Sequence, residues 1–280
     1  MDCVKNIFCV LLLLCVLIMP GQVMAATDIA DGVIRAEGIC DTEQTFSQKR
    51  RAAKLLAQRA LLEQIHGVQI DSKTTVENAV VTSDVINASV SGLIKGAREA
   101  ACFIDEYGYV HVVMELPVYG SINSLASVVM PSVSQHSFLP PSDIIPVDMQ
   151  SIETSTAVDS KQVTIGKIYG ATGQYTGLIV DCSGLGLQTA MAPAIYTDGN
   201  MVVYGLENFS REQVINRGYV GYSNSVDTGV QRAGSNPLIV QAQSIEHFFN
   251  PIISKDDAAK ILAENQMSGF LSSGNVVFIK

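Results

Sequence analysis

The chain has 280 residues, a formal net charge of −9 at pH 7 and a hydrophobic content of 48%. This composition allows a sizeable buried core, and the length suits two ordinary domains or one large one. Nucleic-acid binding is carried by Lys and Arg side chains that neutralise phosphates, so the excess of acid argues against general nucleic-acid binding.

Residues 1–25 have the pattern of a cleaved secretory signal peptide. The segment Ile7–Met19 holds thirteen residues without a charge, which is too short for a spanning helix of about 20 apolar residues. Pro20 then breaks the helix, and small residues precede a cleavage site after Ala25. We therefore expect export from the cytoplasm. An uncleaved N-terminal anchor is the alternative.

The mature chain offers few groups for metal or redox chemistry. It contains no further long apolar run, so we expect no transmembrane span. Three cysteines remain, Cys40, Cys102 and Cys182, and an odd number cannot pair fully within one chain. We expect buried thiols, with a Cys40–Cys102 disulfide as the alternative if their strands are neighbours. The sequence has no Cys-x-x-Cys and no Cys/His cluster, and we expect neither a metal site nor a cofactor.

The first predicted domain covers residues 27–130 and begins with a strand and a long helix. Residues 33–39 alternate in polarity, which predicts a half-buried strand. Asp41 and Thr42 are candidate N-caps for a helix that reaches His66 and stops at Gly67. Small and apolar residues form one stripe of this helix, which indicates close packing against a sheet. The stripe consists of Ala53, Leu56, Ala57, Ala60, Leu61 and Ile65.

The rest of this domain predicts a second helix and a hairpin. Residues 68–70 suit a short strand, and Ser83 with Asp84 caps a helix that ends near Ile94. Residues 97–104 and 109–116 form two strands around the turn 105–108. This order of elements favours an antiparallel sheet covered by helices.

Residues 131–161 are rich in Pro and Ser and show no periodicity, which is typical of a linker. The second predicted domain covers residues 162–280. Its predicted elements are strands at 178–181, 237–243 and 275–279, a hairpin at 194–204 and a helix at 255–265. The fold class is therefore α+β, with two domains that each hold an antiparallel or mixed sheet covered by helices.

Three segments of the first domain carry a resemblance to known proteins: Val33-Ile34-Arg35-Ala36-Glu37-Gly38, residues 51–62 (RAAKLLAQRALL) and Ile65-His66-Gly67-Val68-Gln69-Ile70. Over about residues 30–130 the chain resembles the N-terminal domain of flagellar assembly protein T (FlgT). It is also similar to the small Lpp-type bacterial surface lipoproteins. The second half is similar to uncharacterised exported bacterial proteins. The resemblance implies a bacterial cell-envelope protein, in the periplasm or at the cell surface, whose domain is an assembly or binding module without a known active site.

The segment Asp181-Cys182-Ser183-Gly184-Leu185-Gly186 is the stretch most like a catalytic or nucleotide-binding motif. It has neither the further glycines nor the lysine of a phosphate-binding loop, and we interpret it as a structural turn. Cys182 would need a base to act as a nucleophile, and His247 is the only histidine in that region. An envelope hydrolase with a site near Asp181–Ser183 is the alternative.

Five basic residues lie on the long predicted helix of an otherwise acidic chain: Lys49, Arg50, Arg51, Lys54 and Arg59. Such a group is typical of a solvated helix face. It is also a candidate contact for an anionic envelope component or an acidic partner protein.

The sequence thus predicts a non-catalytic envelope protein that docks a protein partner through strand edges or the outer helix face of the first domain. A small-ligand binder is a further alternative, and it predicts a closed apolar pocket between the domains. The oligomeric state stays open.

The predicted signal peptide can be tested by placing a charge in its apolar segment. We expect Leu12→Arg to block export, because an Arg at the centre of an apolar helix opposes membrane insertion by roughly 3 kcal/mol. Cell fractionation and N-terminal sequencing measure the effect. Normal secretion of the variant, or a native chain that still begins at Met1, would contradict the prediction.

Overall fold

A computed structural model describes residues 27–146 and 169–280. The predicted signal peptide and residues 147–161 of the predicted linker lie outside the described residues. The α+β class is confirmed, because the described chain contains three sheets covered by helices.

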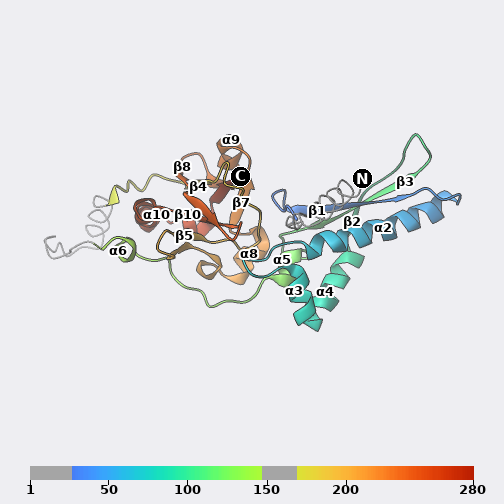
Figure 1. Cartoon of the computed structure of the whole chain (residues 1–280), viewed down its shortest axis with the longest axis horizontal. Helices are drawn as coiled ribbons and strands as arrows, with labels where there is room; N and C mark the ends of the chain where they lie inside the picture. The colour runs from blue at the N-terminus through green and yellow to red at the C-terminus, as the bar shows by residue number, and fades with distance from the viewer. Residues whose placement is uncertain (1–26, 147–168) are drawn as a thin grey trace, which may run out of the picture.

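The first region is a three-stranded antiparallel sheet with one long helix on it. Its strands β1 (Val33–Cys40), β2 (Arg98–Ile104) and β3 (Val110–Pro117) take the order β1-β3-β2. Helix α2 (Phe46–His66) runs along one face of this sheet (Figure 1). The alternation predicted for β1 is confirmed, since Ile34 and Ala36 are buried and their neighbours are more exposed. Strand β3 alternates in the same way, with Val112 and Met114 buried.

Helix α2 begins later than predicted. Its N-cap is Thr45, whose backbone N–H donates to the side-chain oxygen of Gln48 at 3.1 Å. Asp41 and Thr42 were therefore the wrong caps: the Thr45–Gln48 capping box satisfies the helix start three residues downstream. The buried stripe is also narrower than predicted. It keeps Ala53, Ala57, Leu61 and Ile65, while Leu56 is 43% exposed.

The small residues of this stripe let the helix backbone touch the sheet at Gly38. A Cβ placed on Gly38 would lie 2.1 Å from the carbonyl oxygen of Ala53 and 2.3 Å from the backbone nitrogen of Ala57. Only glycine allows that approach. The predicted close packing of the alanine-rich helix on a sheet is therefore confirmed.

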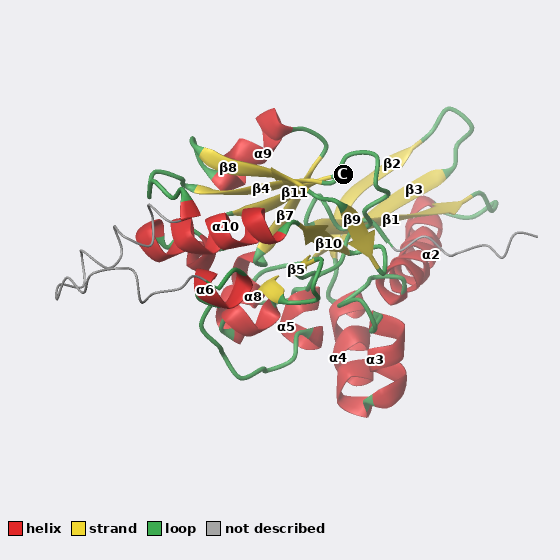
Figure 2. Ribbon diagram, turned by 60° about the vertical axis from the view of Figure 1, so that its left-hand side comes forward, coloured by secondary structure: helices red, strands yellow, loops and turns green. Residues whose placement is uncertain are grey.

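Two further helices form a hairpin that projects from the first region (Figures 1 and 2). Helix α4 (Asp84–Lys95) begins at Ser83 as predicted, and α3 (Val76–Thr82) was not predicted because it holds only seven residues. The short strand predicted at 68–70 is reduced to one bridge between Gln69 and Thr75. Helix α5 (Leu125–Val129) closes the region.

The described part of the predicted linker packs on the second region. Residues 131–140 are irregular, and the short helix α6 (Pro141–Ile144) follows. The backbone N–H of His136 donates to the carbonyl of Glu207 at 2.7 Å, and Ile144 is 4% exposed. Composition predicted a linker here, and the structure adds that its described part is anchored on the second region.

The second region holds two four-stranded sheets. One is mixed, in the order β6-β5-β10-β9, and one is parallel, in the order β7-β11-β4-β8. The mixed sheet consists of β5 (Ile195–Thr197), β6 (Val202–Tyr204), β9 (Ser244–Glu246) and β10 (Asn250–Ile253). The parallel sheet consists of β4 (Gly177–Asp181), β7 (Val220–Ser223), β8 (Pro237–Gln241) and β11 (Val276–Ile279).

The helices of this region are α8 (Arg211–Arg217), α9 (Val226–Ala233) and α10 (Lys255–Ser268), with 3-10 turns η2 (Leu206–Asn208) and η3 (Leu271–Ser273). The expectation of an antiparallel or mixed sheet holds for the first sheet and is wrong for the second, which is parallel. Strands β4 and β11 are almost wholly buried on both faces, which is typical of parallel sheets, but their partners lie far along the chain and local pattern does not specify them.

The two regions share a continuous hydrophobic core and several backbone hydrogen bonds. The N–H groups of Met191 and Ala192 donate to the carbonyls of Gln69 and Ile70, at 2.9 and 2.6 Å. These bonds hold the segment after α2 against the second region. In the part of the chain that the structure describes, no helix has the length and apolar character needed to cross a membrane.

The contact at Gly38 can be tested by adding one methyl group. We expect Gly38→Ala to lower the free energy of unfolding by about 3 kcal/mol, because the added Cβ meets backbone atoms that cannot rotate away. Urea denaturation measures the change. Gly92→Ala is the matched control: this helix position is open, and alanine should raise stability by about 0.5–1 kcal/mol. An unchanged midpoint for Gly38→Ala would contradict the close approach.

Candidate docking surface on the first sheet

Strand β2 is an edge strand that α2 does not cover. It is bonded only to β3, and six of its seven residues are exposed. Phe103 and Ile104 are 47% and 56% exposed, although both are large and apolar. A bulge between Glu99 and Ala101 interrupts its pairing with β3, so Ala101–Ile104 is the regular part of the strand. The free backbone groups of such an edge are a template for another extended chain.

Three of the five predicted basic residues lie on the side of α2 that faces β2. The side chains of Arg50 and Lys54 contact the carboxylate of Glu99, at 2.7 and 3.4 Å. The hydrogen bond from Arg50 lowers the pKa of Glu99, and the same bond raises the pKa of Arg50. The Lys49 ammonium donates to the carbonyl of Gly108 at 3.1 Å, in the turn between β2 and β3. These cations therefore border the edge strand.

The other two predicted residues, Arg51 and Arg59, belong to a different face of α2. Both are exposed, and neither has a side-chain partner among the described residues. They are separated by two helical turns, with Leu55, which is 60% exposed, between them. The structure thus divides the predicted cluster into cations beside β2 and cations on the outer face of the helix.

The sheet face opposite α2 carries a network of cross-strand ion pairs. Glu115 on β3 lies between Arg35 on β1, at 3.4 Å, and Arg98 on β2, whose Nε donates to it at 2.8 Å. The bond from Arg98 lowers the pKa of Glu115. Sequence reasoning missed this network, because alternation shows which residues share a face but not which strands are adjacent.

A histidine on the same face joins two carboxylates. The imidazole of His111 lies 2.6 Å from Glu37 and 3.2 Å from Asp105, and its ring stacks on Phe103 with centroids 4.7 Å apart. The hydrogen bond to Glu37, followed by that to Asp105, raises the pKa of His111. The apolar edge residue Phe103 therefore stacks on an imidazole that two carboxylates hold in place.

The segment Asp181–Gly186 forms a turn after β4. Burial raises the pKa of the Cys182 thiol to about 12, which opposes a role as nucleophile. Its sulfur lies 3.8 Å from the carbonyl oxygen of Val180, and His247 is an exposed residue beside Glu246. The Ser183 N–H donates to the Asp181 carboxylate at 2.9 Å, as in an Asx turn, and Gly184 has φ of 75°. This geometry matches the structural interpretation of the segment.

The condition for a Cys40–Cys102 disulfide is not met. Strand β3 lies between β1 and β2, and both thiols are free. Cys40 and Cys182 are buried and Cys102 is exposed. The prediction of buried thiols is therefore correct for two of the three cysteines. Cys102 differs because α2 leaves β2 uncovered.

Comparison with known families covers the second region. Residues 177–280 match the family described as Treponema pallidum Tp0624, second domain. The matched segment begins with β4 and ends with the chain, so it contains both sheets of this region. No curated protein matches the chain. The match leaves β2 and the rest of the first region outside it.

The pairing of His111 can be tested by titration. We expect an NMR titration to give His111 a pKa above 6.5, and Glu37→Gln to lower it. Because the folded pKa is raised, the stability from this contact is full below about pH 6.5 and is lost as the pH rises through the folded value. The urea midpoints of the native chain and of Glu37→Gln should therefore converge above that value. A His111 pKa below 6.5 would contradict the geometry.

Proposed function

We propose that this chain is an exported cell-envelope protein that acts as a non-catalytic assembly or binding module. It docks an extended segment of an envelope partner protein along the edge of β2. The observation that carries the proposal is the exposure of six of the seven β2 residues on a strand bonded only to β3.

The shape of this edge favours strand addition. The regular part Ala101–Ile104 combines free backbone groups with the exposed side chains of Phe103 and Ile104. Added strands gain affinity from main-chain hydrogen bonds and specificity from alternate side chains. The bulge at Glu99–Ala101 limits uncontrolled pairing of the rest of the strand.

The charges beside the edge favour a partner with acidic residues. Arg98 has 72% of its side chain exposed, and Arg50 has 51%. Both are held by carboxylates of the same sheet, so their positions are set before a partner arrives. Arg51 and Arg59 offer a second contact on the outer face of α2, as the sequence predicts.

The cellular setting rests on the sequence. The signal-like segment 1–25 supports export to the periplasm or cell surface of a bacterium. The resemblance of residues 30–130 to the N-terminal domain of FlgT and to the Lpp-type lipoproteins supports a flagellar or surface-associated role. Burial of Cys182 disfavours this thiol as the nucleophile of the hydrolase alternative near Asp181–Ser183.

The proposed docking edge can be tested with two isoleucine side chains of similar exposure, Ile104 on β2 and Ile239 on β8. We expect Ile104→Asp to reduce recovery of a cross-linked envelope partner at least about tenfold, because an aspartate there loses apolar contact and repels an acidic partner. Ile239→Asp, on strand β8 of the second region, is the matched control and should retain recovery. Cross-linking in whole cells, followed by affinity purification and mass spectrometry, measures both.

Hydrogen exchange gives the second readout. The amides of Ala101–Ile104 should exchange more slowly in the purified complex than in the free protein, since an added strand bonds to them. Circular dichroism establishes that both variants are folded. Equal recovery with Ile104→Asp, or protection confined to other elements, would rule out docking at β2.

A further inference from the structure

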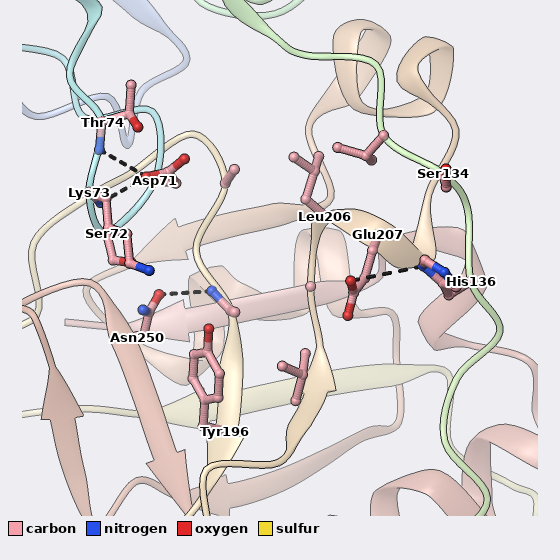
Figure 3. A pocket seen from close by; sticks show the side chains of 15 residues that line it. Asp71, Ser72, Lys73, Thr74, Ser134, His136, Tyr196, Leu206, Glu207 and Asn250 are labelled. Carbon is pink, nitrogen blue, oxygen red and sulfur yellow. Dashed lines mark hydrogen bonds and ion pairs between the residues drawn. The ribbon is translucent and has the colours of Figure 1, made fainter. Parts of the chain in front are cut away.

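One cleft lies where the loop 71–74 of the first region meets residues 133–136 and the mixed sheet (Figure 3). The small-ligand alternative drawn from the sequence predicts a closed apolar pocket between the domains. The lining of this cleft instead includes charged residues of both signs, Asp71 and Glu207 with Lys73. Its charges therefore select no class of ligand.

A pocket within the second region has a lining of one sign only. It lies between the C-terminal end of α8 and the turn η3, and its volume is about 270 Å³, near the lower end of the range of roughly 300–1,000 Å³ that is usual for small-ligand sites. Among the described residues that line it, Arg217 is the only charged one. A pocket with a cation and no carboxylate stands out in a chain with a net charge of −9.

The side chain of Arg217 is held beside this pocket. Its guanidinium donates to Oδ1 of Asn275 at 3.4 Å, and the Asn275 amide nitrogen donates to the carbonyl of Thr176 at 3.1 Å, which fixes the orientation of the amide. No carboxylate of the described residues forms an ion pair with Arg217. A guanidinium has five N–H groups and this bond uses one, so further donors are available for a ligand.

A second guanidinium lies behind the wall of the pocket. Arg232 of α9 donates to three backbone carbonyls of the lining, those of Gly274, Arg217 and Gly218, at 3.0, 3.2 and 2.7 Å. These oxygens would otherwise repel a negative ligand. Bonded to a cation, they leave the wall positive.

The two guanidinium groups are close to each other. Burial, followed by the positive charge of Arg217, lowers the pKa of Arg232. Arg232 also has no carboxylate partner in the part of the chain that the structure describes. Two neighbouring cations without an anion repel each other, and a bound anion would offset that repulsion.

Neutral hydrogen-bond donors complete the lining. The Oε1 of Gln213 accepts from the N–H of Ser210 at 2.9 Å, so the amide nitrogen of Gln213 is the group left to donate. Ser272 and Ser273 add two exposed hydroxyl groups from η3. Carboxylate and phosphate oxygens accept hydrogen bonds from such donors, and a guanidinium matches their geometry with two parallel bonds.

We propose that the pocket between α8 and η3 binds an oxyanion, the carboxylate or phosphate group of a small ligand, with Arg217 in direct contact and Arg232 adding positive charge from behind the wall. This site lies in the second region. It is separate from the β2 edge and goes beyond the docking function.

NMR titration of the full mature chain tests the proposal, with inorganic phosphate and acetate as separate probes at constant ionic strength. We expect the amide signals of Gly218 and Gly274 to shift and to saturate, and the anion that saturates them at the lower concentration identifies a phosphate or a carboxylate ligand. Arg217→Gln should weaken binding at least about tenfold, because it removes charge-assisted hydrogen bonds. Arg217→Lys should recover part of the loss, since lysine keeps the charge but not the planar fork.

Lys255→Gln is the matched control, because it removes one exposed cation at the opposite end of α10 from η3 and should leave binding unchanged. Arg217 is exposed and outside the core, so Arg217→Gln keeps the fold; Ser273→Ala, in the exposed turn, is a second variant and should weaken binding about threefold. Ile104→Asp should bind as the native chain does, which separates this site from the docking edge. The proposal is overturned if neither anion gives saturable shifts, if Arg217→Gln binds as tightly as the native chain, or if Lys255→Gln causes the same loss.

Discussion

The close contact between α2 and β1 at Gly38 determines how the first region is covered. Because the helix backbone touches the strand there, α2 is centred on β1 and β3 and does not extend over β2. A single helix packed this closely against β1 and β3 is too narrow to cover the third strand as well. The exposure of Ile104 and Cys102 follows from this placement, whereas Phe103 lies on the opposite face of the sheet beside His111.

The same helix positions the loop 71–74, which lines a cleft beside the mixed sheet. It ends at Gly67, and the chain then runs through Gln69 and Ile70, whose carbonyls accept backbone bonds from the second region. The loop 71–74 follows at once and is therefore held above the mixed sheet. A shift of α2 on its sheet would move this loop, so the position of the loop and the exposure of the β2 edge depend on one packing contact.

Charge has different roles on the two surfaces. On the first sheet, cations and carboxylates neutralise one another across strands, and such exposed pairs contribute little to stability. Their effect is to hold Arg50 and Arg98 in place beside the edge. In the cleft beside loop 71–74, the lining instead mixes the acidic residues Asp71 and Glu207 with the basic residue Lys73.

Local patterns determined the elements whose signals lie within a few residues. The alternation of β1, the turn at Asp105–Gly108 and the hairpin at residues 194–204 all follow from backbone preferences and side-chain periodicity. The predicted signal peptide also rests on the sequence alone. Only the tertiary structure decided the parallel order β7-β11-β4-β8, the separation of Cys40 from Cys102, and the meeting of Asp71, Asn250 and Glu207 at one cleft. Each of these depends on contacts between segments far apart in the chain, which local preferences do not encode.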